Sequence, residues 1–206
     1  MNDDAILNCK VVLLGESGVG KTSIITRYVN NYFEDNSLTT NGASSTYKTI
    51  YLEKYNKSIK FEIWDTAGQE RYRALTKIFY KNTNAVILCY DITKKGSFNE
   101  IKNYWFNEVK NNSPNDIVIA IAANKSDLYE SEEVNEEEAI NYAKSVGVIF
   151  FETSAMNSSG IDDLFNTIGD KFIDSKYCNE DKLKKNKFKL EDENKNDKIK
   201  KLKKFC

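Results

Sequence analysis

The chain has 206 residues, of which 40% are apolar and 30% are charged, and this composition is typical of a globular domain with a core of ordinary size. It contains no histidine, which excludes imidazole acid–base catalysis and histidine metal sites. No apolar run approaches the roughly 20 residues that span a bilayer, and the first residues lack the apolar stretch of a signal peptide. Four dispersed cysteines lack metal-ligand spacing, and we expect Cys9 and Cys89 to be buried thiols of a reducing compartment.

The net charge of −1 hides an asymmetry along the chain. Residues 176–206 contain twelve lysines and six acidic residues, a net charge of +6, whereas the remaining residues carry a net charge of −7. After the last clear helical pattern, the sequence is too polar to build a core of its own. We therefore predict a domain over residues 1–175 and a flexible, lysine-rich tail over residues 176–206.

Strand-like and helix-like segments alternate through the predicted domain. The expected strands are Lys10–Leu14, Ser45–Glu53, Ile59–Trp64, Ala85–Tyr90, Ile117–Ala122 and Val148–Glu152. The expected helices are Lys21–Asn31, Ser97–Asn111, Asn135–Ser145 and Ile161–Ser175, with a short one near Arg73–Tyr80.

Two of these strands, Ala85–Tyr90 and Ile117–Ala122, are apolar without interruption, as strands buried on both faces of a parallel sheet are. The segment Glu53–Ser58 reads as a hairpin connection, so one edge strand should be antiparallel. These patterns predict an α/β fold with a mostly parallel six-stranded sheet and helices on both faces. In such a fold the functional site lies at the carboxyl ends of the strands.

The segment Gly15–Thr22 reads Gly-Glu-Ser-Gly-Val-Gly-Lys-Thr, a complete phosphate-binding loop between a strand pattern and a helix pattern. Its glycines allow successive backbone N–H groups to point at a polyphosphate. We expect Lys21 to reach the β- and γ-phosphates and Thr22 to ligate Mg²⁺. The loop residues assigned to the nucleotide are Ser17, Gly18, Val19, Gly20, Lys21, Thr22 and Ser23.

A second motif, Asp-Thr-Ala-Gly-Gln-Glu, follows the strand that ends at Trp64. Asp65 at the strand tip is expected to hold Mg²⁺ through water. Gly68 would let its backbone N–H approach the γ-phosphate, and Gln69 is the predicted catalytic residue because its side chain can orient an attacking water.

The residues that follow two further strands indicate which nucleotide base is bound. Asn124-Lys125-Ser126-Asp127 follows one buried strand, and the Asp127 carboxylate can accept from guanine N1–H and N2–H₂, a pair of donors that adenine lacks. This nearly excludes a P-loop ATPase or kinase. Thr153-Ser154-Ala155 follows the last strand and can offer a backbone N–H to guanine O6.

In this order and spacing, the four motifs resemble those of the Ras superfamily of small GTPases. The segments Lys60–Trp64, Arg71–Thr76 and Tyr90–Thr93 resemble the Rab family within it, and the match covers roughly residues 8–175. Gly42–Ser44 and the stretch Lys60–Thr66 resemble the early-endosomal branch of the Rabs.

The resemblance implies a P-loop GTPase that binds GTP and GDP with Mg²⁺, hydrolyses GTP slowly by itself and regulates vesicle trafficking. Its expected partners are a GTPase-activating protein, a nucleotide exchange factor, and effectors that bind switch I (32–43) and switch II (67–80). It also implies a cytoplasmic monomer, peripheral on the cytosolic face of endomembranes, with no nucleic-acid partner.

The family pattern also assigns roles to single residues. Thr40 would coordinate Mg²⁺ only when the γ-phosphate is present, and this contact would order switch I. Phe33 would cover the guanine edge, and Lys125 would pack along the base and ribose. With these, the nucleotide-binding set also includes Gly68, Asn124, Asp127, Ser154, Ala155 and Met156, and the metal set is Thr22, Thr40 and Asp65.

The chain departs from the family pattern at four positions. Asn41 replaces an isoleucine and Met156 a lysine. Ser45 stands where Rabs carry a phenylalanine that, with Trp64 and Phe79, forms an effector-binding triad. These changes keep an alternative open, a nucleotide-bound interaction scaffold that no longer cycles.

The fourth departure is Cys206, which follows Lys203-Lys204-Phe205 where Rabs carry two prenylatable cysteines, and it fits no standard prenylation box. A lysine-rich segment is usually only solvated. The last nine residues, however, hold five lysines and no acid, and each lysine near an anionic lipid surface contributes about 1 kcal/mol, so we expect membrane contact here.

Overall fold

The computed structural model describes residues 6–34, 40, 42–68 and 82–177. The chain divides into two compact units, Met1–Asp170 and Lys171–Cys206. In the second unit residues 171–177 are helical, and the rest of the predicted tail lies outside the described residues. None of the described helices is both long and apolar enough to cross a membrane.

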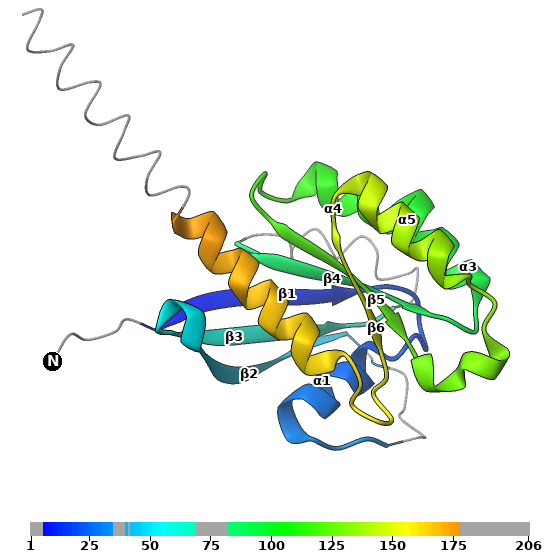
Figure 1. Cartoon of the computed structure of the whole chain (residues 1–206), viewed down its shortest axis with the longest axis horizontal. Helices are drawn as coiled ribbons and strands as arrows, with labels where there is room; N and C mark the ends of the chain where they lie inside the picture. The colour runs from blue at the N-terminus through cyan, green and yellow to red at the C-terminus, as the bar shows by residue number, and fades with distance from the viewer. Residues whose placement is uncertain (1–5, 35–39, 41, 69–81, 178–206) are drawn as a thin grey trace, which may run out of the picture. The chain divides into compact units, whose positions relative to one another are not determined.

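The first unit is built on a six-stranded sheet with the order β2-β3-β1-β4-β5-β6 (Figure 1). All neighbouring strands are parallel except the edge strand β2, which is antiparallel to β3. The predicted fold class is thus confirmed. The strands are β1 (Leu7–Leu14), β2 (Ala43–Leu52), β3 (Lys57–Thr66), β4 (Ala85–Asp91), β5 (Val118–Asn124) and β6 (Ile149–Thr153).

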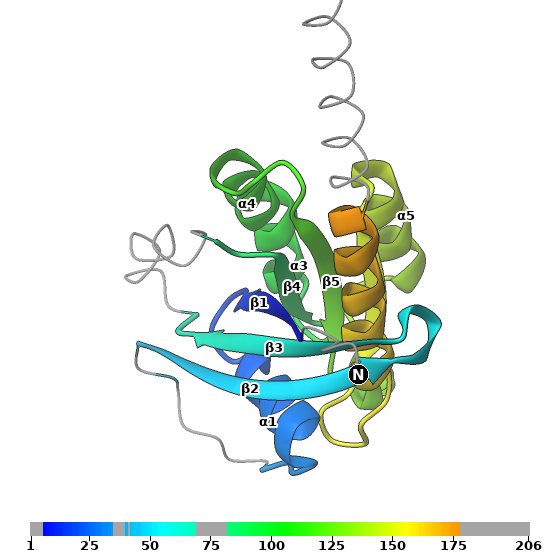
Figure 2. The same cartoon turned by 90° about the vertical axis from the view of Figure 1, so that its left-hand side faces the viewer.

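Some strands begin or end at other residues than predicted, because backbone pairing with the neighbouring strand sets their ends and the apolar pattern does not. β1 begins at Leu7, before the predicted Lys10, because Leu7 pairs with Ile59 of β3. The β2–β3 connection is a 3₁₀ turn, η1 (Glu53–Tyr55), closed by Asn56 in the left-handed region at φ 51°. Figure 2 shows this turn at the end of the β2–β3 pair.

The helices of the first unit are α1 (Lys21–Asn30), α3 (Lys95–Glu100), η3 (Ile101–Trp105), α4 (Phe106–Asn112), α5 (Glu136–Val146) and residues 161–170. The single helix predicted over Ser97–Asn111 is thus three consecutive segments, with the π-helical η3 in the middle. A 3₁₀ turn, η4 (Ser126–Ser131), was not predicted. The short helix predicted near Arg73–Tyr80 lies outside the described residues.

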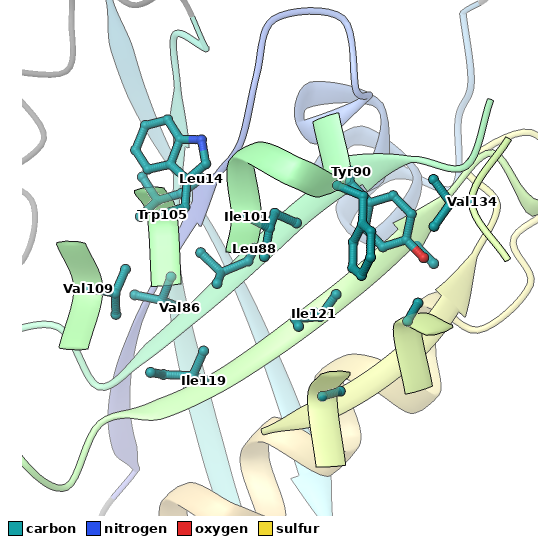
Figure 3. Close-up of a cluster of buried hydrophobic side chains, with 14 of the residues drawn as sticks. Leu14, Val86, Leu88, Tyr90, Ile101, Trp105, Val109, Ile119, Ile121 and Val134 are labelled. Carbon is teal, nitrogen blue, oxygen red and sulfur yellow. The ribbon is translucent and has the colours of Figure 1, made fainter. Parts of the chain in front are cut away.

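The strand pleat places two apolar layers on the sheet. On one face, side chains of β1, β4 and β5 pack with η3, its flanking helices and α5 (Figure 3), and Trp105 is buried there at 2% exposure. On the other face, Tyr28 of α1 stacks on Phe165 with ring centroids 3.7 Å apart, and Phe61 of β3 contacts both rings edge-on. Cys9 and Cys89 are buried thiols, as predicted. These layers hold the carboxyl ends of the parallel strands in a single row.

Candidate functional site

A cavity of about 640 Å³ lies where the loops after β1, β3, β5 and β6 meet. It is lined by Ser17, Gly18, Gly20, Lys21, Thr22, Ser23, Phe33, Glu34, Thr40, Thr66, Gly68, Asn124, Lys125, Asp127, Leu128, Ala155 and Met156. Most of the residues assigned to the nucleotide from the sequence therefore face one cavity. Glu34, Thr66 and Leu128 were not predicted. Val19, Ser154 and Asp65 are buried and do not line the cavity.

The phosphate-binding loop takes the backbone shape that its glycines allow. Gly15, Gly18 and Gly20 have φ values of 143°, 77° and 94°, which disfavour any residue with a side chain. A Cβ on Gly15 would also lie 2.2 Å from the carbonyl oxygen of Cys89. Only glycine therefore lets the loop pass this close to β4.

Lys21, the first residue of α1, points its ammonium group back into this loop. Nζ donates to the carbonyl oxygens of Gly15 at 3.0 Å and Glu16 at 2.8 Å. Burial lowers the pKa of Lys21, and the nearby Asp65 and Glu16 carboxylates oppose that shift. The loop thus presents a largely desolvated cation at the cavity floor.

The side-chain oxygen atoms of Thr22, Thr40 and Asp65 lie close together. The Thr22 hydroxyl donates to Asp65 Oδ2 at 2.7 Å, and the hydroxyl oxygens of Thr22 and Thr40 lie 2.8 Å apart. The second oxygen, Asp65 Oδ1, is buried and has no hydrogen-bond partner among the described residues. Burial raises the pKa of this carboxyl, and the Thr22 hydrogen bond and the Lys21 charge act against that rise. Hydroxyl and carboxylate oxygens suit Mg²⁺, so the donor set fits this ion.

At the other end of the cavity, Asp127 is held by a neighbour. The Ser154 hydroxyl donates to Asp127 Oδ1 and in turn accepts from the backbone N–H of Asn157 at 3.2 Å. The backbone N–H of Ser154 donates to Ser159 O at 3.0 Å. Ser154 therefore orients Asp127, and Ala155 is the member of its motif that lines the cavity.

Lys125 has a buried partner that the sequence did not reveal. Its Nζ lies 2.6 Å from Oδ2 of Asp91, which is fully buried at the end of β4. Asp91 Oδ1 accepts from the backbone N–H and hydroxyl of Thr93. Lys125 itself has φ 67°, in the left-handed region, so its backbone turns out of β5 at this point.

Arg27 is a second residue that sequence reasoning missed. It lies in the last turn of α1, and its guanidinium donates to the carbonyl oxygens of Ala155 at 2.7 Å and Met156 at 2.9 Å. The only available signal was a lone cation on a helix next to the loop, which is usually a solvated side chain.

The two switch segments are described in part. Ala67 donates its N–H to Gly42 O at 2.8 Å, which joins their inner ends. A Cβ on Gly68 would lie 2.4 Å from the Glu16 carbonyl group, so the backbone of Gly68 rests on the phosphate loop. Gln69, the predicted catalytic residue, and Asn41 and Phe79 lie outside the described residues.

Ser45 and Trp64, two positions of the predicted effector triad, are directly opposite each other in the β2–β3 ladder. Ser45 is exposed and Trp64 half-buried, with the indole N–H donating to Glu62 Oε1 at 3.0 Å.

Comparison with known proteins decides which family carries this site. The family model described as "Ras family" matches residues 10–174. The chain belongs to the Ras family.

Similar relatives include human Ras-related protein Rab-22A, 48% identical over 161 residues, which cover 78% of this chain and 81% of the relative. Mouse Ras-related protein Rab-31 is 46% identical over 164 residues, 80% of this chain and 83% of the relative. GTP-binding protein ypt5 of Schizosaccharomyces pombe is 43% identical over 166 residues, 80% of this chain and 78% of the relative. As a Rab-like member of the Ras family, the chain is a small GTPase that hydrolyses GTP and acts in vesicle trafficking.

Proposed function

We propose that this Rab-like GTPase binds GTP and GDP in the 640 Å³ cavity, with the phosphates on the loop Gly15–Thr22 and the base against Asp127. The observation that carries the proposal is that phosphate-loop residues and Asp127 line the same cavity. Asp127 offers acceptors to both guanine donors, and an unmatched base would leave this half-buried carboxylate without them, which is costly. Phe33 and Met156 would flank the base from the two sides of the cavity mouth.

Mg²⁺ would be held by Thr22 and Thr40, with Asp65 acting through water. When bound, the ion would neutralise charge on the β- and γ-phosphates. Thr40 contacts Thr22 from the first switch segment, so a γ-phosphate that recruits Thr40 would order that segment, and loss of the phosphate would release it. This contact supports the proposed switch.

GTP hydrolysis is the attack of water on the γ-phosphate. Gln69 would position the water, while Lys21 and the backbone N–H groups of the loop stabilise the charge that develops on the transferred group. Position 17 is serine, and the loop holds no arginine, so a GTPase-activating protein would supply one, worth roughly 10³–10⁵-fold in rate.

We assign the domain to residues 1–175 and a membrane-directed tail to residues 176–206. The protein would act as a monomer, peripheral on the cytosolic face of endomembranes such as endosomes, and would meet an exchange factor and effectors through its switches. The exposed Ser45 opposite Trp64 supports an effector surface that is more polar than the usual aromatic triad.

Single-turnover GTP hydrolysis tests the proposal against a non-cycling scaffold. The full chain is loaded with GTP, excess nucleotide is removed, and phosphate release is followed with and without added Mg²⁺. Slow, Mg²⁺-dependent release that is lost in Gln69→Leu, with GTP affinity retained, is the expected result. Stable GTP over many hours in the wild type would favour the scaffold. Binding of ATP in place of GTP would refute the base assignment.

A further inference from the structure

Arg27 joins the two sides of the cavity at its base end, although it does not itself line the cavity. Nε and one terminal nitrogen donate to the carbonyl oxygens of Ala155 and Met156, and the other terminal nitrogen donates to Asn31. All three guanidinium nitrogens therefore donate hydrogen bonds. Ala155 lies 128 positions after Arg27 in the sequence, and Asn31 lies four positions after it.

The first of these two sides is the loop after β6. Ala155 and Met156 line the cavity, and both of their carbonyl oxygens are held by Arg27. The preceding Ser154 carries the hydroxyl that orients Asp127. A shift of this loop would therefore move the partner of the base-reading carboxylate as well as the cavity wall.

The second side begins where α1 ends. Asn31, the C-cap of α1, has φ 51° and accepts from Arg27 both through its backbone carbonyl oxygen at 3.0 Å and through Oδ1 at 3.3 Å. Two residues further on, Phe33 lines the cavity. Arg27 thereby sets the direction in which the chain leaves α1 toward Phe33.

We propose that Arg27 is the positioning residue that clamps these two sides together and so controls how fast guanine nucleotide dissociates and how strictly guanine is chosen. This rests on the proposed function, because it assumes that the base sits between the two sides. The planar guanidinium is suited to the task because its donors point at several carbonyl oxygens at once, which a lysine ammonium on the same helix would not reproduce.

The test measures dissociation of tritiated GDP from the full-length chain. We expect Arg27→Met to speed dissociation by roughly tenfold, equivalent to about 1.4 kcal/mol. Arg27→Lys, which keeps the charge without the fork, should give a smaller acceleration and serves if Arg27→Met does not fold. The matched control is Lys102→Met, which removes a cation that pairs with Glu138 on the helical layer, away from the cavity, and should leave dissociation unchanged.

Two further readouts separate positioning from a loss of stability. The preference for GDP over inosine diphosphate, which lacks the N2 amino group, should shrink in Arg27→Met because Ser154 and Asp127 are displaced. The acceleration that EDTA causes by removing Mg²⁺ should keep its wild-type factor, since Arg27 acts at the base end.

An unchanged dissociation rate and an unchanged GDP preference in both Arg27 variants would overturn the clamp while leaving the proposed function intact. A lower melting temperature with an unchanged GDP preference would also overturn it, because Arg27 would then be only structural. A wild-type chain that binds no GDP would instead refute the proposed function, and the clamp with it.

Discussion

Asn124 donates a hydrogen bond of 2.8 Å from Nδ2 to the carbonyl oxygen of Val19, so a residue of the base motif is joined directly to the phosphate-binding loop. Its Oδ1 accepts from the Thr153 hydroxyl at 3.3 Å, and the residue is only 1% exposed. A Cβ on Gly20 would lie 2.2 Å from the same Nδ2. Asn124 therefore ties together the loops that follow β1, β5 and β6, and its side chain serves this scaffold.

Asn124→Asp should lower stability even without nucleotide. The substitution replaces the Nδ2 donor with an acceptor oxygen that faces Val19 O and has no donor there, at a cost of about 1–3 kcal/mol in the free energy of unfolding. Urea denaturation of the nucleotide-free protein measures this. Asn112→Asp is the matched control, since the exposed Asn112 donates to Glu108 O of its own helix, and it should change stability by less than about 0.5 kcal/mol. Equal effects of the two substitutions would contradict the scaffold role.

Asp91→Asn should weaken guanine nucleotide binding although Asp91 does not line the cavity. The change removes the carboxylate charge that lies 2.6 Å from Lys125 Nζ, and the loss of such an ion-pair partner costs about 1–3 kcal/mol. A double-mutant cycle with Lys125→Met, read out as GDP affinity, isolates the pair. If the effects of the two single substitutions simply add, Asp91 does not act through Lys125.

Asp127→Asn should change the base specificity of the site from guanine to xanthine. The carboxylate would accept from two guanine donors, whereas the amide offers one donor and one acceptor, which matches xanthine, where an oxygen replaces the amino group. Competition of GTP and xanthosine triphosphate for the purified variant measures the exchange. Ser154→Ala supplies the comparison, because it loosens Asp127 without changing its hydrogen-bonding chemistry and should lower GTP affinity without favouring xanthine. Unchanged GTP affinity in Asp127→Asn would refute the assignment of the base site.

The sheet could be predicted because its central strands are apolar without interruption, and parallel strands place their carboxyl ends in one row. The site followed from that row, since Lys21, Asp65 and Asp127 belong to motifs at the carboxyl ends of β1, β3 and β5. Where backbone pairing alone sets the end of a strand, as at Leu7, the apolar pattern did not predict that end.

What could not be predicted are the contacts that support the site. The Lys125–Asp91 pair and the bonds from Arg27 to the loop after β6 join residues 34 or more positions apart, and only the tertiary fold brings them together. Ser154 shows the same limit. The sequence predicts a backbone donor from Thr153-Ser154-Ala155, whereas the Ser154 hydroxyl donates to Asp127 and the Ser154 N–H donates to Ser159. The spacing of apolar residues in this helix did not predict the π-helical segment η3.

Cys206 and the lysines before it should need each other for membrane binding. One lipid chain alone gives only marginal, reversible anchoring, and five lysines near anionic lipid add about 1 kcal/mol each. We therefore expect Cys206→Ser to release the protein from membranes, and replacement of Lys198, Lys200, Lys201, Lys203 and Lys204 by glutamine to weaken binding without altering GDP affinity. Fractionation of cells that express each variant measures this, with Cys178→Ser as the matched control. Equal membrane recovery of wild type and Cys206→Ser would reject lipid anchoring at this cysteine, and the nucleotide-binding domain would be unaffected by that result.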